Sequence, residues 1–138
     1  MPCAKILIAD ASEDFLSLCR ETLEGKYEVL TSKEGTEAWD MIESHKPDLA
    51  ILNIELRGLD GLQIARQVKE SKILKNTAVI LVSNVLLDEN LPDGFWRMGT
   101  EADGFITKPI DPARLHAQIQ SVFLKRSGRT PFKPTGYL

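Results

Sequence analysis

Five short apolar segments recur along the chain, and each is followed by polar or turn-forming residues. The first, third and fourth are apolar at nearly every position, which is typical of strands covered on both faces of a parallel sheet. The segments are 6–9, 27–30, 49–52, 78–82 and 104–106. The pattern predicts five strands and requires helices between them.

Helical periodicity fills most of the intervening segments. Ser12 is suited to cap a first helix and Gly25 to end it, a second helix ends before Pro47, a third begins at Gly61, and the last follows Asp111. The residues expected to face inward are Phe15, Leu18, Cys19, Thr22 and Leu23, then Ala38, Met41 and Ile42, then Leu62, Ala65 and Val68, and finally Leu115, Ile119, Val122 and Phe123. Alternating strands and helices predict an α/β fold with a doubly wound parallel sheet.

Two segments do not follow this alternation. Between Ser83 and Gly99, Pro92 and Gly94 interrupt any helix, so we expect a long loop and a short helix from about Asp93 to Met98. Residues 126–138 are rich in proline, glycine and basic residues and predict a flexible tail after a single domain of residues 1–125. In the third helix, Lys69 and Lys72 are expected to face outward.

Composition narrows the classes of protein. A chain of 138 residues with 43% hydrophobic residues is enough for one packed domain. No signal peptide or membrane-spanning segment is visible, so we expect a cytoplasmic protein without membrane contact. Residues 1–124 carry 13 basic and 20 acidic side chains, which argues against direct nucleic-acid binding. Cys3 and Cys19 lack metal or disulfide spacing and are expected to act as small apolar residues.

Polar residues follow four of the predicted strands. Asp10 follows the first, Asn53 the third, Ser83 the fourth and Lys108 the fifth. Ligands bind beyond the carboxyl ends of the strands in open parallel sheets. We therefore expect these four side chains to surround one pocket.

The segments around these residues resemble the receiver domain of two-component response regulators. The matching segments are 5–10, 47–61, 82–83 and 107–109, and the resemblance covers roughly residues 4–125. It implies a flavodoxin-like (βα)5 fold with strand order 2-1-3-4-5. It also implies a Lys108–Pro109 bond that is often cis in this family.

The resemblance implies a pocket chemistry that this sequence does not complete. Receivers hold Mg²⁺ with an acidic pair, phosphorylate an aspartate, contact the phosphoryl group with a hydroxyl and neutralise it with a lysine. Asp10, Ser83 and Lys108 match three of these positions. The second acid is replaced by Ala11 and the acceptor by Asn53, whose amide is a poor nucleophile.

The net charge of the pocket determines how strongly it can attract a metal ion. Each missing unit charge removes about 4 kcal/mol of attraction per cation charge at about 4 Å and an effective dielectric of about 20. Asp10 and Lys108 sum to zero, so we expect weak or absent Mg²⁺ binding, with Asp10 as the one remaining weak ligand, and an Asp10–Lys108 pair. Phe105 occupies the position of the switch aromatic and has no hydroxyl.

Other residues are open to two interpretations. Ser83 either contacts a phosphate or caps the following loop, and the tail is either a solvated end or a tether. Glu55 is a poor substitute acceptor, because its side chain is expected to point outward. Trp39 and Trp96 are candidates for partner contacts, and the alternative for Trp39 is that it only covers the apolar stripe beside Ala38. His45 and His116 are expected to be ordinary surface or boundary residues, and Arg57 stands where receivers often have proline.

Three functions compete. The first is a stand-alone degenerate receiver, not an enzyme, that binds a histidine kinase or another regulator without phosphorylation, in an oligomeric state that the sequence leaves open. The alternative is a genuine Mg²⁺-dependent phosphoacceptor whose aspartate was replaced by Asn53 through engineering or divergence, against which Ala11 argues. The third is a small-ligand site, which lacks a glycine-rich loop after the first strand.

Overall fold

The computed structural model describes residues 4–83 and 102–126 and confirms the predicted parallel sheet. The strands lie in the order β2-β1-β3-β4-β5, and all neighbouring pairs are parallel. Their bounds are β1 Lys5–Ala9, β2 Glu28–Ser32, β3 Leu49–Asn53, β4 Ala78–Ser83 and β5 Gly104–Thr107. The order is the flavodoxin-like one that the resemblance implies.

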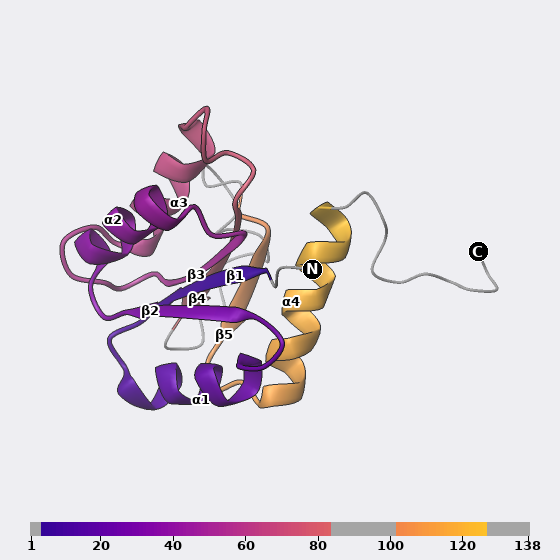
Figure 1. Cartoon of the computed structure of the whole chain (residues 1–138). Helices are drawn as coiled ribbons and strands as arrows, with labels where there is room; N and C mark the ends of the chain where they lie inside the picture. Colours follow the sequence, from indigo (N-terminus) through magenta and orange to yellow (C-terminus); the bar gives the residue numbers. More distant parts are fainter. Residues whose placement is uncertain (1–3, 84–101, 127–138) are drawn as a thin grey trace, which may run out of the picture.

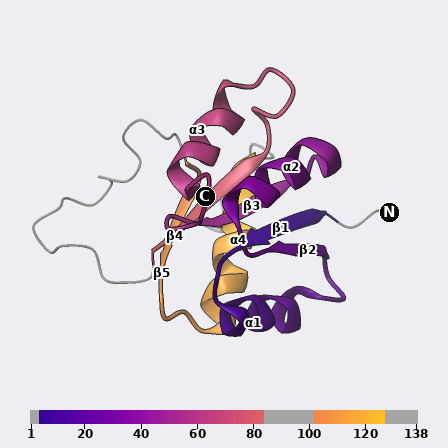
Figure 2. The ribbon, with the colours of Figure 1, turned by 90° about the vertical axis from the view of Figure 1, so that its left-hand side faces the viewer.

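Helices cover both faces of the sheet (Figure 1), and their bounds are α1 Glu13–Leu23, α2 Gly35–His45, α3 Gly61–Glu70 and α4 Pro112–Arg126. The helices α2 and α3 lie on one side and α1 and α4 on the other, as the turned view in Figure 2 also shows. Successive β1 residues divide between the two layers: Ile6 and Ile8 pack with α1 and α4, and Leu7 and Ala9 with α2 and α3. A strand buried on both faces must be apolar throughout, which explains the continuous apolar runs.

The predicted helix starts are present. Ser12 Oγ accepts the N–H of Phe15 at 3.2 Å, and Asp111 Oδ1 accepts the N–H of Arg114 at 2.8 Å. Asp60 and Gln63 form a reciprocal capping box at the start of α3. These contacts satisfy backbone donors that lack a partner inside the helix.

Two details differ from the sequence-based expectation. In α1 the fully buried residues include Leu16, whereas Leu18 and Thr22 are only half-buried, because the helix packs against the sheet and α4 together and its apolar face is broad. Lys69 does not face outward: its Nζ lies 2.9 Å from Asp103 Oδ2 and its side chain is 11% exposed. Lys72 is exposed, as expected.

The loop after β3 is attached to the start of α2. Gly35 donates its N–H to the carbonyl of Arg57 at 2.9 Å, and Gly58 adopts a φ of 81° against Thr36. A Cβ at Gly61 would collide with the carbonyl oxygen of Asn53, so glycine permits α3 to begin directly beside the end of β3. These contacts fix the backbone around Asn53.

Two predicted segments lie outside the described residues: the loop and short helix at 83–99, apart from Ser83, and the tail beyond α4. The predicted domain boundary at residue 125 falls one residue before the end of α4 at Arg126. Within the described ranges, no helix combines the length and the apolar character needed to cross a membrane.

Candidate functional site

The carboxyl ends of β1, β3 and β5 bring Asp10 into direct contact with Asn53 and with Lys108. Asp10 Oδ2 lies 2.9 Å from Asn53 Nδ2 and 2.8 Å from Lys108 Nζ. Asp10 and Asn53 are buried, with exposed fractions of 2% and 1%. Three residues from distant parts of the sequence thus form one polar cluster, as their positions after the strands predict.

The Asp10 carboxylate is held by three donors. Its Oδ1 accepts the N–H of Ser12 at 2.8 Å, and its Oδ2 accepts both Asn53 Nδ2 and Lys108 Nζ. The backbone N–H of Asp10 donates to the carbonyl of Ser32 at 3.0 Å, which anchors the residue to β2. A buried carboxylate is tolerated only when it is hydrogen-bonded and paired, and both conditions are met here.

The amide of Asn53 is oriented from both ends. Its Oδ1 accepts the backbone N–H of Glu55 at 2.7 Å, and its Nδ2 donates to Asp10. An amide suits this position because it supplies one acceptor and one donor, whereas an ionised carboxylate supplies acceptors only. Asn53 therefore fills a position between a backbone donor and a carboxylate.

Lys108 is fixed by contacts on several sides. Its Nζ pairs with Asp10 and also lies 4.3 Å from the ring centroid of Phe15, close enough for a cation–π interaction. Its backbone N–H donates to the carbonyl of Ser83 at 3.0 Å, and its bond to Pro109 is cis, as the resemblance implies. The ammonium group is therefore held between a carboxylate and an aromatic face.

The other predicted pocket residues have different environments. Ser83 ends β4 beside the cluster and is 9% exposed, whereas Ala11 is exposed at the start of the β1–α1 turn. Phe105 is half-buried and packs against the apolar layer beneath α2 and α3, on the other face of the sheet from Phe15. The structure thus brings Ser83 and Ala11 next to the cluster. Phe105 and Lys108 line a common hollow, with Phe105 on the other face of the sheet from Phe15.

The charges of Asp10 and Lys108 affect the pKa of a buried thiol, Cys19. Burial, which is the largest cause, and the nearby Asp10 raise the pKa of Cys19 to about 12 against the opposing effect of Lys108. The side chain is fully buried in α1, as the prediction of a small apolar residue requires. The thiol therefore stays protonated at neutral pH and takes no part in nucleophilic chemistry.

The remaining candidates have other surroundings. His45 and Glu55 are exposed, although the backbone N–H of Glu55 donates to Asn53, and the ring of His116 lies 6.5 Å from the ring of Tyr27. Trp39 is half-buried and covers the apolar layer beneath α2 and α3. Cys3 and Trp96 lie outside the described residues.

Sequence reasoning missed Phe15 and Ser12 as parts of the site. Periodicity identified Phe15 only as an inward residue and Ser12 only as a helix cap. The signal was their spacing from Asp10, because residues two and five positions after Asp10 return to the end of β1 when a helix starts at once.

The polar groups of the cluster supply few ligands for a metal ion. Mg²⁺ prefers carboxylate oxygens and keeps several waters in octahedral geometry. The cluster offers one carboxylate, whose two oxygens already accept three donors. Among residues 4–83 and 102–126, no group of three or more His, Cys, Asp and Glu side chains could hold a metal ion. These residues fit a magnesium ion poorly.

A parallel sheet in this order, with polar residues gathered at the carboxyl ends of its strands, defines a flavodoxin-like α/β protein. The sequence model of the family described as response regulator receiver domain matches residues 6–120, so the chain belongs to that family. Receiver domains are signalling modules of two-component systems that interact with histidine kinases and other regulators.

Curated relatives support this assignment. The alkaline phosphatase synthesis transcriptional regulatory protein PhoP of Bacillus subtilis is 32% identical over 126 residues, covering 89% of this chain and 49% of PhoP. The polar-differentiation response regulator DivK of Brucella anthropi is 30% identical over 120 residues, covering 84% of this chain and 93% of DivK. The chain spans about half the length of PhoP and GtcR, two of the curated relatives it matches.

Solved structures agree with the fold. The signal receiver domain of a signal transduction histidine kinase from Syntrophus aciditrophicus has a TM-score of 0.76 and 28% identity, covering 91% of this chain and 92% of that one. The chemotaxis response regulator CheY4 of Vibrio cholerae has a TM-score of 0.77 at 24% identity, covering 87% and 98% of the two chains.

Proposed function

We propose that this chain is a degenerate receiver that acts in two-component signalling as a phosphorylation-independent protein-interaction module. The observation that carries the proposal is the contact of Asn53 Nδ2 with Asp10 Oδ2, which Lys108 completes. Phosphoryl transfer to a receiver needs an anionic oxygen at position 53, and an amide has none. The pocket residues serve a structural role in which each polar group satisfies the next.

Loss of metal binding is part of the same proposal. Asp10 is the one carboxylate of the cluster, and Ala11 supplies no ligand beside it. Recruiting Mg²⁺ would require removing Lys108 from Asp10 and leaving the ammonium group over Phe15 without its counter-charge. The expected affinity for Mg²⁺ is therefore weak or nil, and the module is not an enzyme.

The interaction partner is proposed to be a protein of the signalling pathway, a histidine kinase or another regulator. The family supports this class of partner, and the acidic balance of residues 1–124 disfavours direct contact with nucleic acid. We also propose that the module is a stand-alone protein of the cytoplasm. Such receivers occur among its relatives, because the matched region covers 93% of DivK.

Acetyl phosphate with Mg²⁺ tests the proposal directly. The full chain and three variants, Asn53→Asp, Ala11→Asp, and the double variant, are incubated with this donor and analysed by intact-protein mass spectrometry. We expect phosphoryl uptake only in the double variant, because it alone restores both a nucleophile and a second metal ligand. Glu55→Gln in the double variant is the control for the site of attachment and should not change the result.

Two outcomes would count against the proposal. Appreciable labelling of the unmodified chain would show that phosphorylation does not need a carboxylate at position 53. Efficient labelling of Asn53→Asp alone at an ordinary Mg²⁺ requirement would favour the genuine phosphoacceptor with a replaced aspartate.

A further inference from the structure

The strand β2 forms one edge of the sheet and lies between α1 and α2 (Figure 1). In the part of the chain that the structure describes, its sheet partner is β1 alone. Glu28 donates its N–H to Ala4, and Ser32 accepts from Asp10, so alternate residues of β2 face β1. Val29 and Thr31 direct their backbone groups to the open edge, where they present hydrogen-bonding groups to a further strand.

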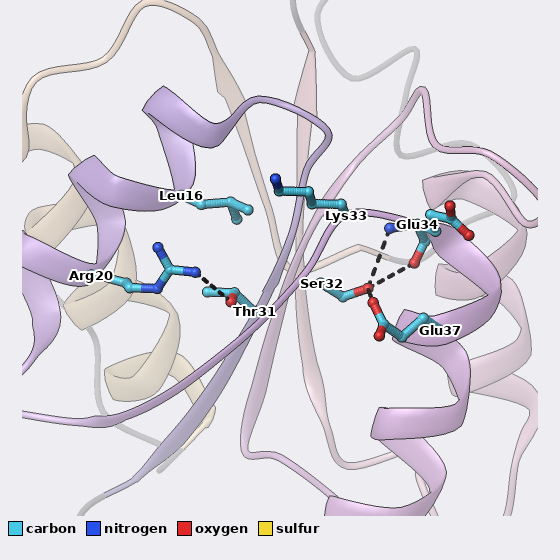
Figure 3. A pocket seen from close by; sticks show the side chains of 7 residues that line it. All are labelled: Leu16, Arg20, Thr31, Ser32, Lys33, Glu34 and Glu37. Carbon is cyan, nitrogen blue, oxygen red and sulfur yellow. Dashed lines mark hydrogen bonds between the residues drawn. The ribbon is translucent and has the colours of Figure 1, made fainter.

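A hollow of about 360 Å³ lies at the carboxyl end of this edge. Figure 3 shows Leu16 and Arg20 on its α1 side and Glu34 and Glu37 on its α2 side. Ser32, on its floor, is 3% exposed and hydrogen-bonds Glu37 at 2.6 Å. An added strand along β2 would bring one of its side chains into this hollow.

The cations that line the hollow are already paired. Glu13 lies 2.7 Å from Lys33 and 3.4 Å from Arg20, and Arg20 also donates to Thr31 at 2.8 Å. Hydrogen bonding to Lys33 is the main cause of the lowered pKa of Glu13, so this carboxylate stays ionised. Glu34 and Glu37 form no ion pair within the described residues and can receive a cation.

The surroundings of the edge carry a strong negative charge. Residues 13–43 contain nine acidic and three basic side chains, while the whole chain has a net charge of only −3. All nine acidic side chains are exposed. Two copies joined through this edge would repel each other, whereas a basic segment would be attracted.

We infer that the open edge of β2 binds an extended basic segment of a partner protein, which adds a strand to the sheet and places a lysine or arginine in the hollow. Main-chain hydrogen bonds to Val29 and Thr31 supply affinity, and the acidic side chains select a basic partner. The inference rests on the proposed function, because it names the surface and the chemistry through which the module would bind.

Fluorescence anisotropy with a short labelled peptide, in which lysine alternates with valine, tests the inference on the full chain. A second peptide has N-methyl groups on alternate backbone amides, which preserves its charge but removes the donors. We expect the first peptide to bind and the second to bind at least about tenfold more weakly, since strand addition depends on the backbone. Equal binding of the two peptides would mean simple charge attraction and would overturn the inference.

Charge reversal provides the matched control. Glu34→Lys and Glu70→Lys change the net charge equally, but only Glu34 lines the hollow, whereas Glu70 is exposed on α3. We expect Glu34→Lys to weaken the first peptide about threefold to tenfold and Glu70→Lys to leave it nearly unchanged. Equal weakening by both variants contradicts a specific site.

Amide hydrogen exchange gives a test that needs no variant. Peptide binding should slow exchange at Val29 and Thr31 while exchange at Leu30, which faces β1, changes little. Unchanged exchange at Val29 and Thr31 would overturn the inference.

Tighter peptide binding after removal of residues 127–138 would also overturn the inference, because the chain's own tail would then be the occupant of the edge. Phosphoryl uptake by the unmodified chain would instead overturn the proposed function and leave the peptide results standing.

Discussion

Asn53 differs from an aspartate by one terminal atom, and the cluster depends on that atom. Its Nδ2 donates to Asp10, a group that already receives Ser12 and Lys108. An oxygen in the same place would face another oxygen at hydrogen-bond distance. Asparagine at this position therefore stabilises the cluster, whereas the aspartate of a receiver reacts with the phosphoryl donor.

Asn53→Asp should lower the free energy of unfolding by about 1–3 kcal/mol at neutral pH, because a buried donor is lost and two carboxylates approach each other. Urea unfolding measures the change, and the loss should shrink in acid, where one carboxyl binds a proton. Asp10→Asn in the Asn53→Asp background is the control and should recover part of the stability. A variant as stable as the parent at pH 7 would contradict the role given to Nδ2.

Cys19 provides a second prediction at this scale. Burial raises its pKa in the folded protein to about 12, above the ordinary value of 9.0. The folded state thus favours the neutral thiol, so the contribution of Cys19 to stability is complete below pH 9.0 and is lost as pH rises toward 12. In a Cys3→Ala background, an exposed-thiol reagent should modify Cys19 only in denaturant, and Cys19→Ala should flatten the alkaline loss of stability. Rapid modification of the native protein would contradict this burial.

Among the elements, α3 shows how closely the pocket is built into the fold. It begins at Gly61, where a side chain would meet the carbonyl of Asn53, and its cap is completed by Asp60 and Gln63. The helix start and the end of β3 therefore constrain each other.

Gly61→Ala should destabilise the protein by about 1–3 kcal/mol, because a Cβ would displace the end of β3. Helix propensity alone predicts the opposite sign, a gain of about 1 kcal/mol for alanine. Gly25→Ala is the comparison: its φ of 93° costs strain but no atom lies within 4 Å of the new Cβ. Thermal unfolding of both variants separates collision from strain, and a stabilised Gly61→Ala would refute the close approach.

The elements themselves were largely predictable from the sequence. Strands buried on both faces leave continuous apolar runs, and Ser12, Asp60 and Asp111 are short polar residues at helix starts. The inward face of α1 was less predictable, because packing against two neighbours buried Leu16 rather than Leu18. Periodicity specifies the direction of a helix face but not its width.

At the scale of the whole molecule, contacts between distant residues were predictable where the topology alone brings the residues together. Asp10, Asn53 and Lys108 meet because three parallel strands end at one edge. The contacts of Lys69 with Asp103 and of Lys108 with Phe15 depend on side-chain reach across the fold, which spacing does not encode.

The Lys69–Asp103 pair connects α3 to the approach of β5. Asp103 Oδ2 also accepts the N–H of Val79, and Lys69 Nζ donates to the carbonyl of Thr77. Lys69→Met should lower the free energy of unfolding by about 1–3 kcal/mol, because the half-buried carboxylate loses its counter-charge. Lys72→Met, at an exposed lysine nearby, is the control and should change little. Equal effects of the two variants in urea unfolding would contradict the connection.

The contact of Phe15 with Lys108 has a consequence for protein engineering. Phe15 belongs to the apolar layer beneath α1 and α4, and its ring centroid lies 4.3 Å from Lys108 Nζ, so the scaffold and the polar cluster share a side chain. Asp10 and Asn53 are buried as well, so new metal or acyl chemistry installed in the cluster has to replace the hydrogen bonds that it removes. A sequence of this kind is a starting point for such chemistry when each new side chain supplies a partner for its buried neighbours.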